Sequence, residues 1–176
     1  MQALFGSSAL TMHRRALGVS DSPVGVETRR KSVSQERTFA RDVGDLEVLQ
    51  RSLLEMSEEV AAQLRKEGDC ARTVVLKMRY PDFTTITRQV TLVQPTDLAE
   101  AICAQAHKLL QREWNKGTQL RLIGVGVTGL SQARQLGLFD THTEQLTKLS
   151  KAVDEIRSKY GDDAIRRASL LKPDER

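Results

Sequence analysis

Residues 73–92 read TVVLKMRYPDFTTITRQVTL, and this stretch decides the fold. Its two ends, Thr73–Tyr80 and Thr84–Leu92, are rich in β-branched and apolar residues that alternate with polar ones, a pattern typical of strands. Pro81 and Asp82 lie between them and are common turn residues. The stretch therefore predicts a β-hairpin.

An amphipathic helix is expected on each side of the hairpin. Asp45 is a suitable N-cap for the first helix and Gly68 a suitable end. Thr96 or Asp97 would cap the second helix, which ends before Gly117. Apolar residues recur at steps of three and four in both helices, at Leu46, Leu49, Leu53, Met56, Val60 and Leu64 and then at Leu98, Ile102, Ala106 and Leu109.

Two further strands, Lys31–Ala40 and Leu120–Val127, complete the order βαββαβ. This order predicts an α+β fold in which a four-stranded antiparallel sheet carries both helices on one face, the ferredoxin-like arrangement. The other face of the sheet would be open. This unit fills residues 31–130.

The remaining residues form three smaller segments. Residues 1–30 predict a helix end and an extended linker, and residues 131–142 a polar connector. Residues 143–176 predict a helical tail whose first helix, 143–160, carries an apolar stripe. The stripe either docks on the domain or binds a partner, and docking is the interpretation we favour.

Length and composition exclude several protein classes. A chain of 176 residues suits one domain with tails. Cys70 and Cys103 are too few for a disulfide framework or a zinc quartet. Neither a signal peptide nor a run of about 20 apolar residues is present, so a secreted or membrane-spanning protein is not expected. We expect a reduced, cytoplasmic protein without a membrane partner.

Charge is distributed unevenly over these elements, although the formal net charge is only +4. The strands and their turn, with the flanking residues Arg41 and Arg72, hold eight basic residues against two acidic ones. The first helix, with its flanking residues, holds three basic against seven acidic. A basic open sheet rich in Ser and Thr suits a phosphate backbone. The alternative is that these charges only solvate an open face.

The kind of nucleic acid follows from the aromatic residues. RNA-recognition sheets of the same strand order stack bases on aromatic side chains of the inner strands. The strands that we expect in the centre offer Thr85, Thr87, Lys77 and Arg79 instead. Because Phe39, Tyr80 and Phe83 lie at strand ends, we expect them in the core. Duplex binding is therefore favoured over single-strand stacking.

Three blocks, residues 31–39, 80–88 and 120–127, resemble the little-finger domain of Y-family translesion DNA polymerases of the DNA polymerase IV type. The resemblance covers residues 30–130, and residues 5–24 are similar to the end of that family's thumb domain. It implies a sheet that holds the phosphates of template–primer duplex DNA. The DNA contacts that the resemblance implies are Ser32, Ser34, Arg37, Thr87, Arg88 and Arg121. Lys77 and Arg79 are added because we expect them on the basic open face of the sheet.

Two consequences of the resemblance concern chemistry. In that family a palm domain holds the catalytic carboxylates and Mg²⁺. No such constellation is found in this chain, so we expect no catalytic residue, no metal site, no cofactor and no polymerase activity from it alone. The alternative is a free-standing, non-catalytic module for DNA or clamp binding. Gly124 and Gly126 fit either close backbone approach to DNA or a strand bend.

The connector holds a second motif, Gln135-Leu136-Gly137-Leu138-Phe139. It is similar to the bacterial sliding-clamp-binding pentapeptide, in which Gln135, Leu136, Leu138 and Phe139 are the residues that match. Leu138 and Phe139 would enter an apolar pocket of the clamp and Gln135 would bond at its rim. The alternative is an apolar turn that caps the core.

Overall fold

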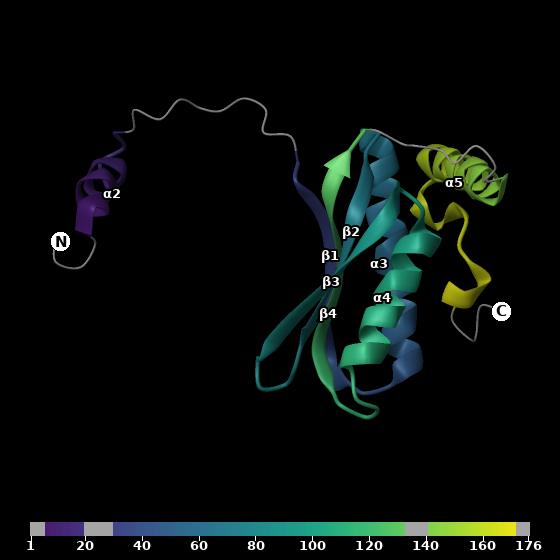
Figure 1. The fold of residues 1–176 in the computed structure, drawn as a ribbon, viewed down its shortest axis with the longest axis horizontal. Coiled ribbons are helices and arrows are strands. Elements are labelled where there is room, and N and C mark those ends of the chain that lie inside the picture. The colour runs from purple at the N-terminus through teal and green to yellow at the C-terminus, as the bar shows by residue number, and fades with distance from the viewer. Residues whose placement is uncertain (1–5, 20–29, 133–140, 172–176) are drawn as a thin grey trace.

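The computed structural model describes residues 6–19, 30–132 and 141–171 (Figure 1). Four strands and two helices make the domain, and further helical elements stand before and after it. In chain order the elements are η1 (Gly6–Ser8), α2 (Ala9–Ala16), β1 (Ser32–Val43), α3 (Leu46–Glu67), β2 (Cys70–Arg79), β3 (Thr85–Thr96), α4 (Ala99–Glu113), β4 (Leu120–Ser131), α5 (Thr141–Tyr160), η2 (Asp162–Ala164) and η3 (Ala168–Leu170).

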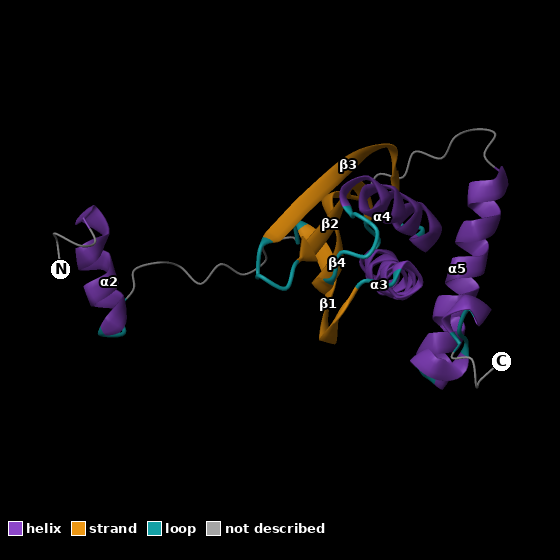
Figure 2. Cartoon of the chain, turned by 90° about the horizontal axis from the view of Figure 1, so that it is seen from below, coloured by secondary structure: helices purple, strands orange, loops and turns teal. Residues whose placement is uncertain are grey.

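The sheet is antiparallel throughout, with the strand order β1-β4-β2-β3. Helices α3 and α4 lie together against one of its faces, as Figure 2 shows. The predicted α+β class, the four-stranded antiparallel sheet and the two-helix layer are thus confirmed. Each βαβ unit is split, since β4 lies between β1 and β2, and β2 lies between β3 and β4. The strand order differs from that of the ferredoxin-like arrangement, in which the first and third strands are central, because β4 and β2 are central here. The expected central position of Thr85 and Thr87 is therefore wrong, since β3 is an edge strand.

Helix α3 begins and ends where its sequence predicts. Asp45 has extended backbone, and its side chain accepts the Glu47 N–H at 2.8 Å, which satisfies one free donor of the first turn. Gly68 ends the helix in the left-handed conformation, φ +70°. The face between these ends is buried from Leu49 to Leu64, whereas Leu46 is partly exposed.

Helix α4 begins one or two residues later than expected. Its N-cap is Leu98, which has no side-chain oxygen to offer. The Thr96 hydroxyl accepts the Leu98 N–H at 3.1 Å instead, so this threonine orders the entry to the helix without being its cap. The difference arises because β3 continues to Thr96 and leaves only a short turn before the helix.

The core fills the space between the sheet and the two helices. Alternate residues of β2 and β4 point into it and meet the inner faces of α3 and α4. Trp114 closes one end and donates its indole N–H to the Thr118 carbonyl at 2.7 Å. The largest fully buried side chains of the core include Leu49, Leu53, Leu64, Leu76, Met78, Ile102, Leu110, Leu120 and Ile123.

The aromatic residues of the strand ends divide into two groups. Phe39 and Tyr80 are half-buried against the core, as predicted. Phe83 is 64% exposed at the tip of the β2–β3 hairpin, so its predicted place in the core is wrong. The reason is the turn itself, in which Phe83 adopts φ +66°.

Helix α5 and the residues after it lie beside the helical layer, on the side away from the sheet (Figure 2). Only part of the predicted apolar stripe makes this contact: Leu146 and Val153 are half-buried, whereas Leu149 and Tyr160 are more than half exposed. A groove of about 1140 Å³, lined by charged residues of α3 and α5, separates the two helices. The tail is therefore docked as expected, but mainly through its charged residues.

Candidate nucleic-acid interface

The face of the sheet away from the helices is a regular grid of mostly small and polar side chains. Residues directly opposite each other in antiparallel strands share a face, so the register defines four rows across β1, β4, β2 and β3. We call these sixteen positions the open-face grid. Its rows are Ser32–Thr128–Thr73–Thr91, Ser34–Gly126–Val75–Gln89, Glu36–Gly124–Lys77–Thr87 and Thr38–Leu122–Arg79–Thr85.

An ion pair spans the middle of the grid. Lys77 Nζ lies 2.8 and 2.9 Å from the two carboxylate oxygens of Glu36, on the far side of β4. Gly124 lies between them in the same row, and a Cβ atom at this position would stand 2.8 Å from Glu36 Cγ and 3.1 Å from the Gln35 carbonyl. The glycine thus makes room for the Glu36 side chain within the sheet, a role that differs from both of the roles that the sequence leaves open.

A shallow hollow of about 190 Å³ lies over Gly124 and Gly126. Gly126 leaves the backbone of β4 partly accessible, whereas Gly124 is buried, and a Cβ at Gly126 would lie 3.2 Å from Ser34 Cβ. Hydroxyl groups of Ser32, Ser34 and Thr87 surround the hollow together with Lys77. Hydroxyls and ammonium groups are donors that phosphate oxygens accept from.

Hydroxyl groups dominate the rest of the grid. Arg79 donates from Nε to the Thr85 hydroxyl at 2.8 Å, which orients its guanidinium along the outer row. The hydroxyls of Thr73 and Thr91 lie 3.4 Å apart. Eight of the sixteen positions are Ser or Thr, so the grid offers many short donors at fixed spacing.

Five of the eight residues predicted to contact DNA lie on the open-face grid. Two others, Arg37 and Arg88, point to the helical side. Arg37 pairs with Glu55 of α3 at 2.6 Å, and Arg88 pairs with Glu113 of α4 at 2.8 Å. The five on the grid are Ser32, Ser34, Lys77, Arg79 and Thr87.

Arg121 lies at the beginning of β4, beyond the outer row of the grid. Its Nε lies 3.2 Å from Asp42 Oδ1, and its guanidinium carbon lies 4.7 Å from the centre of the Phe83 ring. The side chain is 38% exposed. Arg121 therefore joins the end of the sheet to the hairpin tip.

The charge on the grid is smaller than the strand composition suggests. Within the grid, all of which is described, the charged residues are Lys77, Arg79 and Glu36. The expectation that the whole basic excess of the strands lies on the open face is therefore wrong. Strand alternation is the cause, since Arg37 has the parity of Val33 and Phe39, which point toward the helices.

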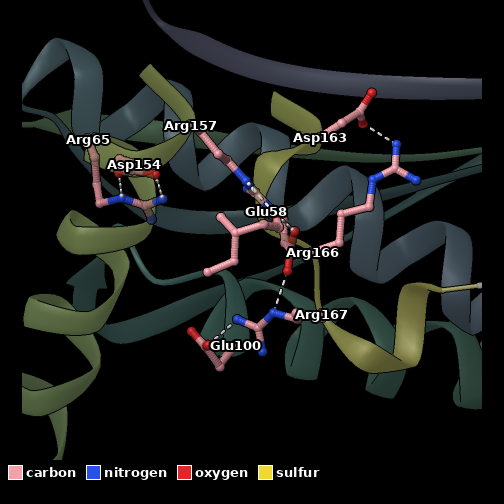
Figure 3. A network of polar contacts seen from close by, with 9 residues as sticks. Glu58, Arg65, Glu100, Asp154, Arg157, Asp163, Arg166 and Arg167 are labelled. Atoms are coloured by element: carbon pink, nitrogen blue, oxygen red, sulfur yellow. Dashed lines mark hydrogen bonds and ion pairs between the residues drawn. The ribbon is translucent and has the colours of Figure 1, made fainter. Parts of the chain in front are cut away.

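The opposite, helical face holds a network of ion pairs between the domain and the C-terminal tail (Figure 3). Arg157 and Arg167 both pair with Glu58 of α3, and Arg167 also pairs with Glu100 of α4. Burial by itself would raise the pKa of Glu100, but the hydrogen bond and charge of Arg167 lower it below the ordinary value of 4.5. Arginines of the tail thus compensate the acidic surface of the helices.

Arg65 of α3 makes the most buried of these contacts, with a side chain that is 10% exposed. It binds both carboxylate oxygens of Asp154 in α5, at 2.6 and 2.9 Å, and donates to the Asp97 carbonyl at 2.8 Å. Leu170 of η3 is buried, and its carbonyl accepts from Arg51. These contacts attach α5 and η3 to the domain.

Other predicted features have plain outcomes. Cys70 and Cys103 are buried thiols that form no disulfide bond, and burial raises the pKa of the Cys103 thiol. Across the described ranges, His, Cys, Asp and Glu nowhere form a group of three or more that could hold a metal ion. None of the helices in those ranges combines the length and apolar character that crossing a bilayer requires. The motif at Gln135, Leu136, Leu138 and Phe139 lies outside the described residues.

The grid and the two-helix layer define a βαββαβ domain with one free sheet face. This chain belongs to the family described as the impB/mucB/samB family C-terminal domain, which matches residues 30–138. It is similar to the protein named DNA polymerase IV in several bacteria. The identity is 39% over 176 residues for Desulfatibacillum aliphaticivorans, 36% over 169 for Caulobacter vibrioides and 31% over 180 for Clostridium kluyveri.

These matches cover 95–97% of this chain, which spans about 42–45% of the length of those relatives. The resemblance to Y-family polymerases of the DNA polymerase IV type is thereby confirmed. The matched region of the family includes all four strands, helices α3 and α4, and the first residues of the connector.

Proposed function

We propose that this domain binds duplex DNA through the open-face grid, as the DNA-holding part of a translesion DNA polymerase. The observation that carries the proposal is the combination of partly accessible β4 backbone at Gly126, eight hydroxyl groups and two cations on one face that no helix of the described residues covers. Such a surface meets phosphates without reading bases, because hydroxyls and cations contact the backbone of any sequence. The similarity to DNA polymerase IV supports this choice of ligand.

The geometry favours weak and sequence-independent binding. Lys77 and Arg79 are the cations of the grid, and Lys77 is already paired with Glu36. Each phosphate contact by a cation steepens the dependence of log affinity on log salt by about 0.9. We therefore expect Arg79 to contribute about −0.9 to the slope and the paired Lys77 much less. The exposed residues Lys31 and Arg41 would add to it.

A titration of duplex DNA over a series of salt concentrations tests the proposal. We expect the wild-type affinity to fall steeply with salt and the double variant Lys77→Ala/Arg79→Ala to bind about tenfold more weakly with a shallower slope. Lys108→Ala is the matched control, because Lys108 is an exposed lysine on the helical side. Affinity that is independent of salt, or an equal loss in the control, would contradict the proposal.

Recruitment of a sliding clamp is the second part of the proposal, and it rests on the pentapeptide alone. A tethered clamp would raise the local concentration of the domain at DNA without new DNA contacts. We expect Leu138→Ala/Phe139→Ala to lose capture by an immobilised bacterial clamp, while the circular dichroism and the DNA affinity of the chain stay unchanged. Capture that survives the double substitution would refute this part.

The polymerase reaction itself would need residues other than those described. We infer that the described residues bind DNA and do not catalyse nucleotide transfer. In a full-length polymerase, Mg²⁺ would be held by residues elsewhere. A free-standing module for DNA or clamp binding is the alternative. An open reading frame that continues upstream into paired carboxylates of a palm domain would exclude that alternative.

A further inference from the structure

The tip of the β2–β3 hairpin carries an aromatic ring to which duplex binding assigns no role. Phe83 is 64% exposed, although phenylalanine is usually a core residue. Among the described residues it is also the only non-glycine residue with positive φ, at +66°. A bulky side chain in this region is uncommon, and the surrounding turn has to hold it there.

The turn fixes Phe83 with four hydrogen bonds. Asp82 accepts both the Thr84 N–H and the Thr84 hydroxyl at 2.9 Å. The Phe83 N–H bonds to the Tyr80 carbonyl at 3.0 Å, and the Tyr80 N–H bonds to the Thr84 carbonyl at 2.9 Å. The ring is therefore presented in a position set before any ligand arrives, and a preorganised group loses less entropy on binding.

A cation stands against the ring. The guanidinium carbon of Arg121 lies 4.7 Å from the ring centre, and Asp42 holds the same guanidinium from the other side. The outer row of the grid, with Arg79 and Thr85, ends at the residues next to this turn. An exposed ring beside arginines and hydroxyls differs from an apolar protein-binding patch, which gathers several apolar side chains.

We propose that Phe83 and Arg121 form a stacking platform for an unpaired nucleobase at the border between duplex and single-stranded DNA. A base inside a duplex has neighbours on both faces, whereas an unpaired base has a free face that an aromatic ring or an arginine plane can cover. The neighbouring cations and hydroxyls bind the phosphates that flank such a base. This inference rests on the proposed function, because the open-face grid holds the adjoining duplex.

Fluorescence anisotropy with two DNA molecules tests the platform: a blunt duplex and the same duplex with a single-stranded overhang. We expect the wild-type chain to prefer the overhang DNA about tenfold. Phe83→Leu keeps apolar bulk but lacks the ring, so it should lose this preference and keep its affinity for the blunt duplex. Phe83→Trp should retain the preference. Val93→Ala, at a 92% exposed apolar residue of β3, is the matched control.

The outcomes separate the two proposals. A Phe83→Leu chain that keeps the overhang preference, or a wild-type chain without any preference, overturns the platform while duplex binding stands. A wild-type chain that binds neither DNA overturns the proposed function. A single-stranded oligonucleotide with 2-aminopurine then decides the platform, which requires a fluorescence change with the wild type that Phe83→Leu abolishes. Equal signals from both chains would overturn it.

Discussion

The open face of the sheet and the helical face opposite it use their charged residues differently. On the open-face grid a single ion pair, Lys77–Glu36, lies among hydroxyl groups and glycines. On the helical face the arginines of the tail are bound to carboxylates of α3 and α4 (Figure 3). The carboxylates of the helical face are thus paired with arginines of the same chain, whereas the hydroxyl-rich open face is left for a ligand.

This contrast shows why net charge is a poor guide to the binding face. Arg37 and Arg88 belong to strands, but both form ion pairs with carboxylates of the helices. The cations that remain for DNA are few, and their effect depends on Glu36 as much as on their number. Three substitutions and one mapping experiment test the contrast.

The largest effect is expected from Arg65→Met on the helical face. The substitution removes the bidentate bond to Asp154 and the bond to the Asp97 carbonyl. Because Asp154 is 30% exposed and can be rehydrated, we expect a loss of about 2 kcal/mol in the free energy of unfolding. Urea denaturation measures this loss.

Arg112→Met provides the matched control for that experiment. Arg112 also pairs with a carboxylate, that of Glu113, but its side chain is 64% exposed. Such an exposed pair contributes little to stability, so we expect a much smaller loss than in Arg65→Met. Equal losses in the two variants would show that the tail is not anchored by Arg65, and a DNA affinity that falls in Arg65→Met would break the separation of the two faces.

A smaller effect, of opposite sign, is expected from Glu36→Gln on the open face. The amide keeps the shape of the side chain but releases Lys77 and removes the negative charge of the grid. Duplex affinity should rise about fivefold, and the salt slope should steepen by about 0.9. Glu59→Gln, at an exposed glutamate of α3, is the control and should change neither quantity. A weaker Glu36→Gln complex would mean that Glu36 positions Lys77 for DNA.

The smallest effect is expected on stability at low pH, through Glu100, which pairs with Arg167 of the tail. Since the pKa of Glu100 is lowered in the folded protein, its contribution to stability is complete above its ordinary value of 4.5 and is lost as pH falls through the lowered pKa. The stability difference between wild type and Glu100→Gln should be constant from pH 5 to 7 and should shrink below pH 4.5. Denaturation at each pH measures it, and a difference that grows in acid would contradict the assignment. We expect less than about 1 kcal/mol.

Much of the fold could be predicted because local patterns determine it. Asp45 and Gly68 mark the ends of α3, and the alternation in 73–92 marks the hairpin. Strand order could not be predicted, since it depends on pairing between β1 and β4, which are about 80 residues apart. The edge position of β3, and so that of Thr85 and Thr87, follows from this pairing.

Strand alternation predicts which face of the sheet a charged side chain occupies, and it carries two such signals for the candidate site. Arg88 shares its parity with Ile86 and Val90, which pack on the core, so alternation alone could have placed it on the helical side. Glu36 shares its parity with Ser32 and Ser34 and could have been assigned to the open face. Phe83 could not have been found in this way, because its exposure depends on the turn geometry.

The most direct test of the separation of faces is to map which backbone amides respond to DNA. Two-dimensional NMR of the ¹⁵N-labelled chain with a short duplex reports each amide separately. We predict that shifts concentrate on the grid, at Lys77, Gly124 and Gly126, while the amides of α3 and α4 that face the tail, such as Glu58 and Glu100, stay unchanged. Shifts that concentrate on α3, α4 and α5 instead would contradict the account.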